Sequence, residues 1–407
     1  MLAGIVVQCE SHLLWGHQRN QTMPMNVSDA PQRTDSAHQK DLRVIEVDPR
    51  TDPRWESFVC KHPDGAIYHH PAWLIALECE YGQKGIYLAC VNSDEQLLAV
   101  LPLVSTRGLP FRFGGALAGR RISSLPRTPV AGPLSTHPQA TAALLQEAVR
   151  RVTAQPGTTL QVKAQEPDLD GLVDGVVGMP WRQTFILQLP AQLNEPYRIS
   201  NSRQRGVVRW AINKAERMGV RIRSAETASD LKAWYRLYLE TMRRSFVPPR
   251  PYRFFLALWE HLRPAKLMNL LIAEQELAGR HRIIAGAVFL TFGKTMSYSF
   301  SGSGSGDLSL LPNDLLIWRA INDACEKKCQ FFDLGEVPEG KEGLAKFKKK
   351  WGAEPVRMYR YYYPISPTAE DDADEPKGSL IALVNSVWTH LPLWAVSWIG
   401  DQVYSRL

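Results

Sequence analysis

The sequence predicts a mixed α+β fold with two successive cores. The chain has 407 residues, and a single domain usually has about 100–200 residues. Short segments with alternating apolar residues, which predict strands, are interspersed with segments that have apolar residues at helical spacing. In residues 295–335 a strand, a Gly/Ser-rich loop, a helix and a second strand follow one another. This order of elements indicates a mixed α/β protein built around sheets.

The beginning of the chain shows no element pattern. Residues 17–41 are polar and aperiodic, so we expect residues 1–41 to be a disordered tail. The first sixteen residues are apolar but lack a basic region and a small-residue cleavage site, which argues against a secretory signal peptide. Six cysteines occur without a C-x-x-C pair, which fits a reducing cytoplasm. The net charge of +7 permits anionic partners without requiring them.

A first domain is expected over residues 42–190. Its helices begin at Pro53 and Ala72 and, after a long connection, at Pro138, where proline or helical periodicity marks each start. Residues 107–136, rich in Gly, Arg and Pro, are interpreted as a connecting loop, with phosphate binding by Gly114-Gly115 and Gly119–Arg121 as the alternative. The expected strands are 42–47, 85–91, 96–104, 159–164 and 182–189.

A second domain is expected over residues 191–365. It begins with a basic helix within 197–219, where Arg205 and Arg209 lie at i, i+4 and form a basic stripe; a solvated face is the alternative. The helix after the Gly/Ser loop begins at Pro312, and Gly335 is expected to end the strand that starts at Phe331. The other expected elements are strands 220–223, 267–274, 282–290, 295–300 and 359–364 and helices 228–243, 252–262 and 343–350.

The end of the chain changes in composition twice. Residues 366–378 form an acidic linker, and residues 379–407 are expected to form an amphipathic or hydrophobic helix. The stretch 379–399 has no charge and contains Trp388, Trp394 and Trp398, but Asn385, His390 and Pro392 interrupt it. We therefore expect it to lie on a membrane interface or on the protein itself, and a membrane-spanning helix is the less favoured alternative.

Three separated motifs in the second half lead to a family resemblance. They are Pro312-Asn-Asp-Leu-Leu316, Phe332-Asp-Leu-Gly335, and Gly343-Leu344 followed by Phe347-Lys348 and Trp351-Gly352. In this order they resemble the FemAB branch of the GNAT-like acyltransferases, including members associated with PEP-CTERM and exopolysaccharide systems. Over roughly residues 45–365, the resemblance implies two tandem GNAT-like domains, each a twisted, mostly antiparallel sheet flanked by helices.

Acyl transfer needs a base for the acceptor and a stabiliser for the negative charge that develops on the carbonyl oxygen. Asp333 and Glu336 lie at the end of a predicted strand, where carboxylates reach the edge of a sheet, so they are candidate bases; for Asp333 a turn-stabilising role is the alternative. Lys348 is the candidate electrostatic stabiliser, because in the resembling family the Phe-Lys pair lies beside the reacting ester or thioester. A solvated basic helix face is the alternative for Lys348.

Several residues are candidates for binding rather than chemistry. Phe347 belongs to the Phe-Lys pair, and Tyr298 lies on the strand before the Gly/Ser loop. Asn313 begins a helix, where exposed N–H groups favour an anion, although helix capping explains it equally. Arg205 and Arg209 complete the set, because the resembling family has a similar basic helix near its acceptor cleft.

The resemblance implies an acyl donor, which we expect to be an acyl-CoA, and no metal. Residues 301–307 lack the Gln/Arg-x-x-Gly-x-Gly/Ala loop that wraps the CoA pyrophosphate in acetyl-CoA-binding members. The sequence also lacks the heptads of the coiled-coil arm found in members that use aminoacyl-tRNA, so tRNA is the less favoured donor.

The expected reaction is therefore acyl transfer, in the first instance N-acyl transfer. The expected acceptor is a small molecule or a saccharide or lipid-linked intermediate of the cell envelope or of an exopolysaccharide. The expected place is the cytoplasm, with peripheral contact to the inner face of the plasma membrane through residues 379–399. Two alternatives stay open, namely an aminoacyl-tRNA-dependent peptidyltransferase on a peptidoglycan precursor and a non-catalytic GNAT-like binding module.

Overall fold

The computed structural model describes residues 42–107, 120–190, 197–277, 279–365 and 387–405. The expected tail 1–41, the acidic linker 366–378 and the start of the C-terminal segment lie outside the described residues. All the described residues belong to one compact unit.

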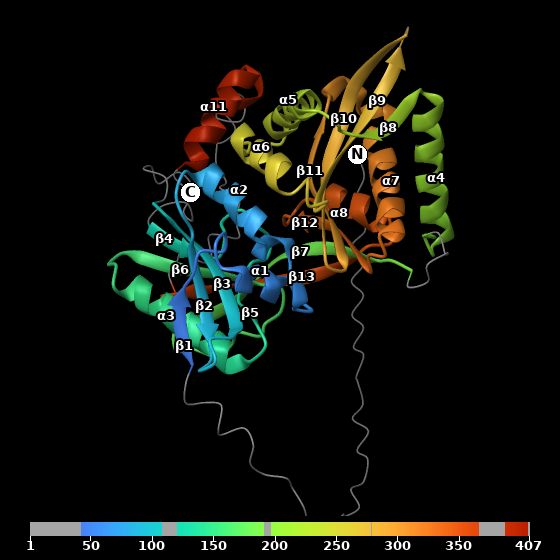
Figure 1. Cartoon of the computed structure of the whole chain (residues 1–407). Helices are drawn as coiled ribbons and strands as arrows, with labels where there is room; N and C mark the ends of the chain where they lie inside the picture. Colours follow the sequence, from blue (N-terminus) through green and yellow to red (C-terminus); the bar gives the residue numbers. More distant parts are fainter. Residues whose placement is uncertain (1–41, 108–119, 191–196, 278, 366–386, 406–407) are drawn as a thin grey trace, which may run out of the picture. The chain divides into compact units, whose positions relative to one another are not determined.

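The described strands form one mixed sheet of thirteen strands flanked by helices (Figure 1). Its order is β1-β2-β3-β4-β6-β13-β7-β12-β11-β10-β9-β8, with β5 paired to β3. Most neighbours are antiparallel, while β4 with β6 and β11 with β12 are parallel. The predicted fold class, a mixed α/β protein with mostly antiparallel pairing, is confirmed.

The N-terminal half agrees with the sequence pattern in most elements. Apolar side chains of α3 pack on β2, β3 and β6 and enclose a core that includes Leu144, Leu101 and Val162. The elements are β1 (Arg43–Glu46), α1 (Pro53–Lys61), the 3-10 turn η1 (Ile67–His69), α2 (Pro71–Tyr81), β2 (Ile86–Val91), β3 (Leu97–Thr106), β4 (Arg120–Ser123), β5 (Leu134–Ser135), α3 (Pro138–Thr153), β6 (Thr158–Ala164) and β7 (Val177–Gln188).

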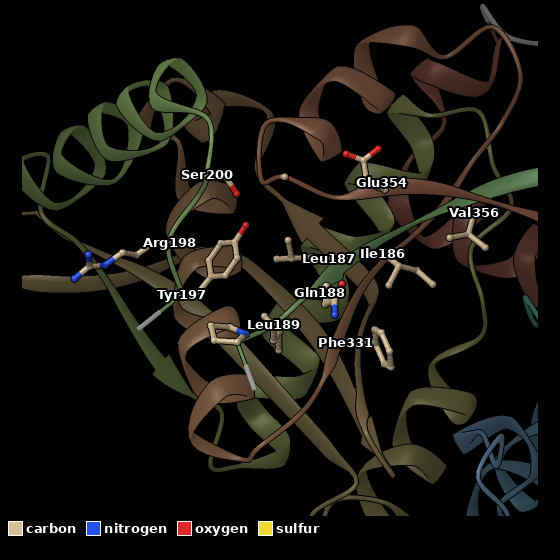
Figure 2. A pocket seen from close by; sticks show the side chains of 12 residues that line it. Ile186, Leu187, Gln188, Leu189, Tyr197, Arg198, Ser200, Phe331, Glu354 and Val356 are labelled. Atoms are coloured by element: carbon tan, nitrogen blue, oxygen red, sulfur yellow. The ribbon is translucent and has the colours of Figure 1, made fainter. Parts of the chain in front are cut away.

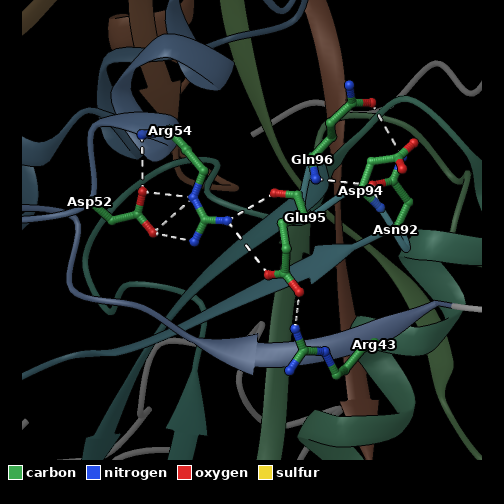
Figure 3. Close-up of polar contacts among 7 residues, drawn as sticks. All are labelled: Arg43, Asp52, Arg54, Asn92, Asp94, Glu95 and Gln96. Atoms are coloured by element: carbon green, nitrogen blue, oxygen red, sulfur yellow. Dashed lines mark hydrogen bonds and ion pairs between the residues drawn. The ribbon is translucent and has the colours of Figure 1, made fainter.

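The turn between β2 and β3 shows why polar residues end these strands (Figure 3). The Asn92 side-chain oxygen accepts the backbone N–H groups of Asp94 and Gln96 at 3.0 and 2.9 Å, which is the usual way that asparagine stabilises a turn. Arg54 donates to Asp52 at 2.7 Å and to the Glu95 carbonyl at 2.8 Å. These bonds tie the start of α1 to the turn.

The C-terminal half has helices on both faces of its strands. On one face α4 and α7 enclose a core with Leu316, Ile321 and Phe332, and on the other α5 and α6 pack with α2, so that the Trp73 and Phe254 rings are 5.6 Å apart. The elements are α4 (Ser202–Arg217), β8 (Val220–Ser224), α5 (Ala228–Arg244), α6 (Tyr252–His261), β9 (Met268–Leu277), β10 (Arg280–Phe292), β11 (Thr295–Ser303), η3 (Ser305–Leu310), α7 (Pro312–Glu326), β12 (Phe331–Val337), α8 (Glu342–Lys349), β13 (Glu354–Tyr363) and α11 (Leu393–Tyr404).

Three sequence predictions were wrong. Residues 107–136 are not one loop, because β4 and β5 lie within them; Gly114-Gly115 and Gly119 lie outside the described residues. Gly335 does not end β12: it takes a left-handed conformation (φ 83°) at an irregularity in the pairing with β7, and the strand continues to Val337. Glycine adopts this conformation without the steric penalty that other residues pay.

The third error concerns the last strand of the sheet. It is β13, it starts at Glu354 rather than Tyr359, and it pairs with β6 and β7 of the N-terminal half. The strand β7 in turn pairs with β12. Strands from both predicted domains are therefore hydrogen-bonded in one sheet, and the domain boundary at residue 190 stays a prediction.

The C-terminal segment forms a shorter helix than expected. α11 begins at Leu393, directly after Pro392, because proline has no N–H for the helix ladder and is tolerated at a helix start. Residues 379–386 lie outside the described residues. Within the residues that the structure does describe, none of the helices combines the length and apolar character that spanning a membrane requires.

Candidate active site

Asp333 lies on β12 just before the irregularity at Gly335. Its Oδ1 atom accepts the Thr184 hydroxyl at 2.6 Å and the Gly335 N–H at 2.8 Å. Burial raises the pKa of the Asp333 carboxyl, and these two hydrogen bonds together with the charge of Lys348 oppose the rise. The predicted turn role is thus present in the structure, and the same contacts hold the carboxylate in one orientation.

Lys348 is buried, with 5% of its surface exposed, although it belongs to a basic helix. Its Nζ atom donates to the carbonyl oxygens of Gly335 and Glu336 at 2.7 and 2.9 Å. Burial lowers the pKa of Lys348 to about 8, while the carboxylates of Asp333 and Glu336 oppose this shift. The structure therefore brings Asp333, Glu336 and Lys348 together, as expected from their motifs.

Tyr68, a residue of the N-terminal half, reaches the same cluster from η1. The Ser297 side chain is among the groups that act on its pKa, and Ser297 is the register partner of Asp333 in the parallel pair of β11 and β12. Burial raises the pKa of Tyr68, and the charges of Asp333 and Glu336 raise it further. The sequence does not indicate a role for this residue, because a tyrosine before a helix start carries no functional pattern of its own.

Tyr298 and Phe347 lie around a neighbouring ion pair. Burial raises the pKa of Tyr298, the Ser301 side chain opposes the rise, and the charge of Asp314 adds to it. Asp314 is buried, with 4% exposed, and pairs with Lys350. The Lys350 Nζ lies 4.2 Å from the centre of the Phe347 ring. Tyr298 and Phe347 therefore converge on this pair from different elements.

Tyr298 and the Asp314–Lys350 pair lie next to the group of Asp333, Glu336 and Lys348, and the two groups meet at Gly335. A Cβ atom added to Gly335 would lie 3.5 Å from the Tyr298 carbonyl oxygen and 3.7 Å from Lys348 Nζ. Asn313, next to Asp314 in the first turn of α7, has a buried side-chain oxygen without a hydrogen-bond partner. That orphaned acceptor is the kind of group that a donor on a bound molecule can satisfy.

Arg205 and Arg209 occupy a different place. They line a hollow of about 390 Å³ on α4 together with Ser202, Gly206, Trp210, Asn213 and Arg217. α4 packs on α7 (Figure 1), and all seven lining residues belong to α4 itself. The predicted basic stripe is therefore real, but it forms a separate groove.

A larger hollow of about 810 Å³ lies at the start of β12 (Figure 2). Ile186 and Gln188 of β7, Phe331 of β12, and Glu354 and Val356 of β13 contribute to its wall. Phe331 and Asp333 are two residues apart on one strand and so point to the same face of the sheet. The predicted site residues themselves do not line this hollow.

Among the described residues, Glu56, Cys60 and His70 are a group with the chemistry to hold a metal, with ligand atoms within 4.8 Å of one another. His70 Nδ1 accepts the N–H of Ala72 at 3.2 Å, and Nε2 lies 3.3 Å from Glu56. This arrangement places the ring proton on Nε2, the nitrogen that faces Glu56. The ring lone pair that a metal needs is therefore on Nδ1, where the Ala72 N–H already engages it.

Comparison with known families identifies the second half. Residues 202–349 match the family model described as an acetyltransferase (GNAT) domain. This part of the chain is a GNAT domain. All eight residues predicted for the site from sequence lie inside the matched range, whereas Tyr68 and Thr184 lie outside it. No curated protein matches the sequence.

Solved structures extend the similarity over most of the chain. FemX shares 15% identity and a TM-score of 0.57, over 84% of this chain and 100% of that one. The C-terminal domain of a putative lysylphosphatidylglycerol synthetase from Agrobacterium fabrum shares 11% identity (TM-score 0.52, 82% and 94%). L-PGS from Bacillus licheniformis shares 13% identity (0.52, 84% and 98%). At these identities the structural comparison shows the fold alone. Together with the family model over residues 202–349, it supports the predicted resemblance to FemAB-like proteins of GNAT type.

Proposed function

We propose that the protein is an acyltransferase that moves an acyl group from a thioester donor to an amine, or to a hydroxyl, of a cell-envelope or exopolysaccharide intermediate. The observation that carries the proposal is the buried ammonium of Lys348, fixed by two carbonyls beside Asp333 and Glu336 within a GNAT domain. A cation that is oriented before the reaction, in a site sheltered from water, stabilises negative charge on a carbonyl oxygen far better than an exposed lysine does.

The other residues divide the remaining tasks. Asp333, oriented by Thr184 and Gly335, or Glu336 takes the proton from the amine as its nitrogen bonds to the acyl carbon. The C–S bond of the thioester then breaks, and the donor leaves as a thiol that takes up this proton. Tyr68 faces both carboxylates and donates a hydrogen bond to the acceptor or relays its proton. Tyr298, Asn313 and Phe347 bind the reacting part of the donor. The name of one similar structure, a putative lysylphosphatidylglycerol synthetase, supports a lipid-linked acceptor that belongs to the cell envelope.

A second candidate donor, an aminoacyl-tRNA, is favoured by two observations. The first turn of α7, next to which acetyl-CoA-binding GNAT domains hold the CoA pyrophosphate, is already occupied by the carboxylate of Asp314, which pairs with Lys350. The α4 groove offers Arg205, Arg209 and Arg217 beside Trp210, which is 56% exposed. Clustered arginines beside an exposed aromatic ring are typical of surfaces that bind nucleic acid.

One experiment decides between the donors. The full-length protein is incubated with acetyl-CoA, longer acyl-CoAs or aminoacyl-tRNA and with amine-bearing nucleotide sugars, and donor loss and acceptor mass are followed. We expect acyl-CoA consumption that requires Lys348. If transfer occurs only from aminoacyl-tRNA and is lost in the Arg205→Ala/Arg209→Ala double variant, the donor is an aminoacyl-tRNA. Absence of transfer from every donor, together with tight binding of an anionic saccharide, would identify a non-catalytic module.

A further inference from the structure

The helix α11 presents its largest apolar side chains outward. Trp394 and Trp398 are 74% and 59% exposed, and their spacing of four residues puts both indoles on one face. The buried positions of the helix are Val396, Gly400 and Tyr404. A surface helix ordinarily buries its bulky apolar side chains, so this orientation needs an explanation.

α11 is firmly attached by its other face. Gly400 lies against Pro249, and an added Cβ there would lie 2.3 Å from the Pro249 carbonyl oxygen. Asp401 pairs with Arg253 at 2.7 Å, and the Tyr404 ring lies 5.6 Å from the Arg250 guanidinium. The helix is therefore held without the two tryptophans, and they stay displayed at the surface.

A second apolar element lies beside the helix. Phe246 and Val247, in the turn after α5, are 45% and 36% exposed. This turn runs alongside α11, because Arg243 donates to the Leu391 carbonyl at 2.8 Å at one end and Pro249 contacts Gly400 at the other. We call Trp394, Trp398, Phe246 and Val247 the tryptophan face. Trp388, predicted to act with the other two, is not part of it, because its indole nitrogen is buried.

The charges around the tryptophan face are basic. Arg243 lies at the start of α11, where it donates to the Leu391 carbonyl, and Arg253 near its end pairs with Asp401, so these three groups together carry a net positive charge. A second copy of the chain on this face would bring its own net positive charge against this one, which is unfavourable. Anionic lipid headgroups, in contrast, complement them.

We propose that the tryptophan face docks on the interfacial region of a bilayer that contains anionic lipid. Indole rings favour this region because their apolar body and polar N–H match its two sides. The proposal stands on the surface itself and does not depend on the reaction proposed above.

The test uses the full-length protein and sedimentation with phosphatidylcholine vesicles, with and without phosphatidylglycerol, at low and high salt. We expect binding to the anionic vesicles and a blue shift of tryptophan fluorescence. Trp394→Ala/Trp398→Ala should weaken this binding at least about tenfold, since each buried indole contributes a large apolar area. Trp210→Ala on α4 is the control, because it removes another exposed indole, 56% exposed against 59% for Trp398, from a different surface.

Three results overturn the proposal. They are no binding to anionic vesicles, equal binding by the double variant, and an equal loss of binding in the control. Analytical ultracentrifugation of the same proteins tests whether a second copy of the chain binds the tryptophan face instead. If the wild type self-associates, the double variant does not, and neither binds vesicles, the face is an interface between copies. Thermal unfolding of each variant separates loss of docking from loss of fold.

Discussion

At Lys348 two electrostatic effects oppose each other. Removal from water disfavours the ammonium, while the carboxylates of Asp333 and Glu336 favour it, and the resulting pKa is about 8. The side chain is thus cationic at neutral pH but close to its titration. In this it differs from its exposed neighbours on α8, such as Lys349, which share its sequence pattern.

Replacement of Lys348 by methionine tests its role directly. We expect Lys348→Met to lower the rate of acyl transfer by about 10²–10³-fold, the usual loss when one stabilising group for a developing oxyanion is removed. Lys349→Met, one residue further on the exposed face, should keep the rate. The assay is single-turnover transfer under saturating donor. If both variants lose activity to the same extent, the loss reflects the overall charge of α8, and Lys348 has no specific role in the reaction.

The lowered pKa of Lys348 also predicts a pH profile. The ammonium loses its proton as pH rises through about 8, so the transfer rate should fall above that pH. Lys348→Arg should remove the fall, because arginine stays charged. The effect of pH on stability has the opposite direction. Between about pH 8 and 10.5 the unfolded state binds more protons at Lys348 than the folded state does, so the free energy of unfolding increases as pH rises through this range. A rate that is flat across pH 8 in the wild type contradicts the assignment.

Asp333→Asn separates the two interpretations of Asp333. An asparagine oxygen can still accept the bonds from Thr184 and Gly335, so the fold should be retained, while a base is lost. We expect the rate to fall by about 10²–10⁴-fold with little change in the urea midpoint. Full activity of this variant would leave Asp333 a turn residue and transfer the role of base to Glu336.

At the scale of elements, α5 can pack on β11 only because Gly302 has no side chain. A Cβ atom on Gly302 would lie 2.4 Å from the backbone nitrogen and 2.7 Å from the Cα of Tyr238. Backbone atoms cannot yield as the end of a flexible side chain can. A glycine is thus required at this point of β11 for the helix to approach the strand.

Gly302→Ala should therefore lower the free energy of unfolding by about 1–3 kcal/mol, the usual range for overpacking. Gly306→Ala in η3 is the control, since an added Cβ there meets nothing within 4 Å. Urea unfolding followed by circular dichroism measures both. Equal stability of the two variants would mean that α5 can shift away from β11 without loss.

At the scale of the molecule, a buried ion pair joins the two halves. Glu80 of α2 and Arg250, just before α6, have side chains that are 0% and 4% exposed. Arg250 also donates to the Arg127 carbonyl and lies under the rings of Phe254 and Tyr404. Burial raises the pKa of Glu80 to about 7, although the arginines oppose this rise.

A raised pKa of a carboxyl has a defined consequence for stability. The contribution of Glu80 is fully present below its ordinary pKa of 4.5 and is lost as pH rises through about 7, because the folded state must then release the proton. Glu80→Gln should flatten this part of the stability profile between about pH 4.5 and 7. The measurement is the urea midpoint at a series of pH values in both proteins. An unchanged slope would show that Glu80 stays ionised throughout.

The sequence by itself determined most helices and strands and the group around Lys348. Local patterns suffice for this: apolar periodicity sets an element, and prolines such as Pro138 and Pro312 mark where helices begin. The group could be predicted because Asp333, Glu336 and Lys348 lie within sixteen residues of one another, joined by one turn and one short helix. Chemistry carried by a single continuous segment is visible in its motif.

Contacts between distant segments were decided only by the tertiary structure. Tyr68 meets Asp333, β13 crosses to β6, and Arg250 meets Glu80 across more than a hundred residues of sequence in each case. The sequence also did not predict that Lys348 alone is buried out of four lysines with the same pattern. Nor did it predict that Trp394 and Trp398 point outward. The physical reason is that exposure and charge environment depend on which elements pack together, and periodicity within one element says which side chains share a face but not what covers it.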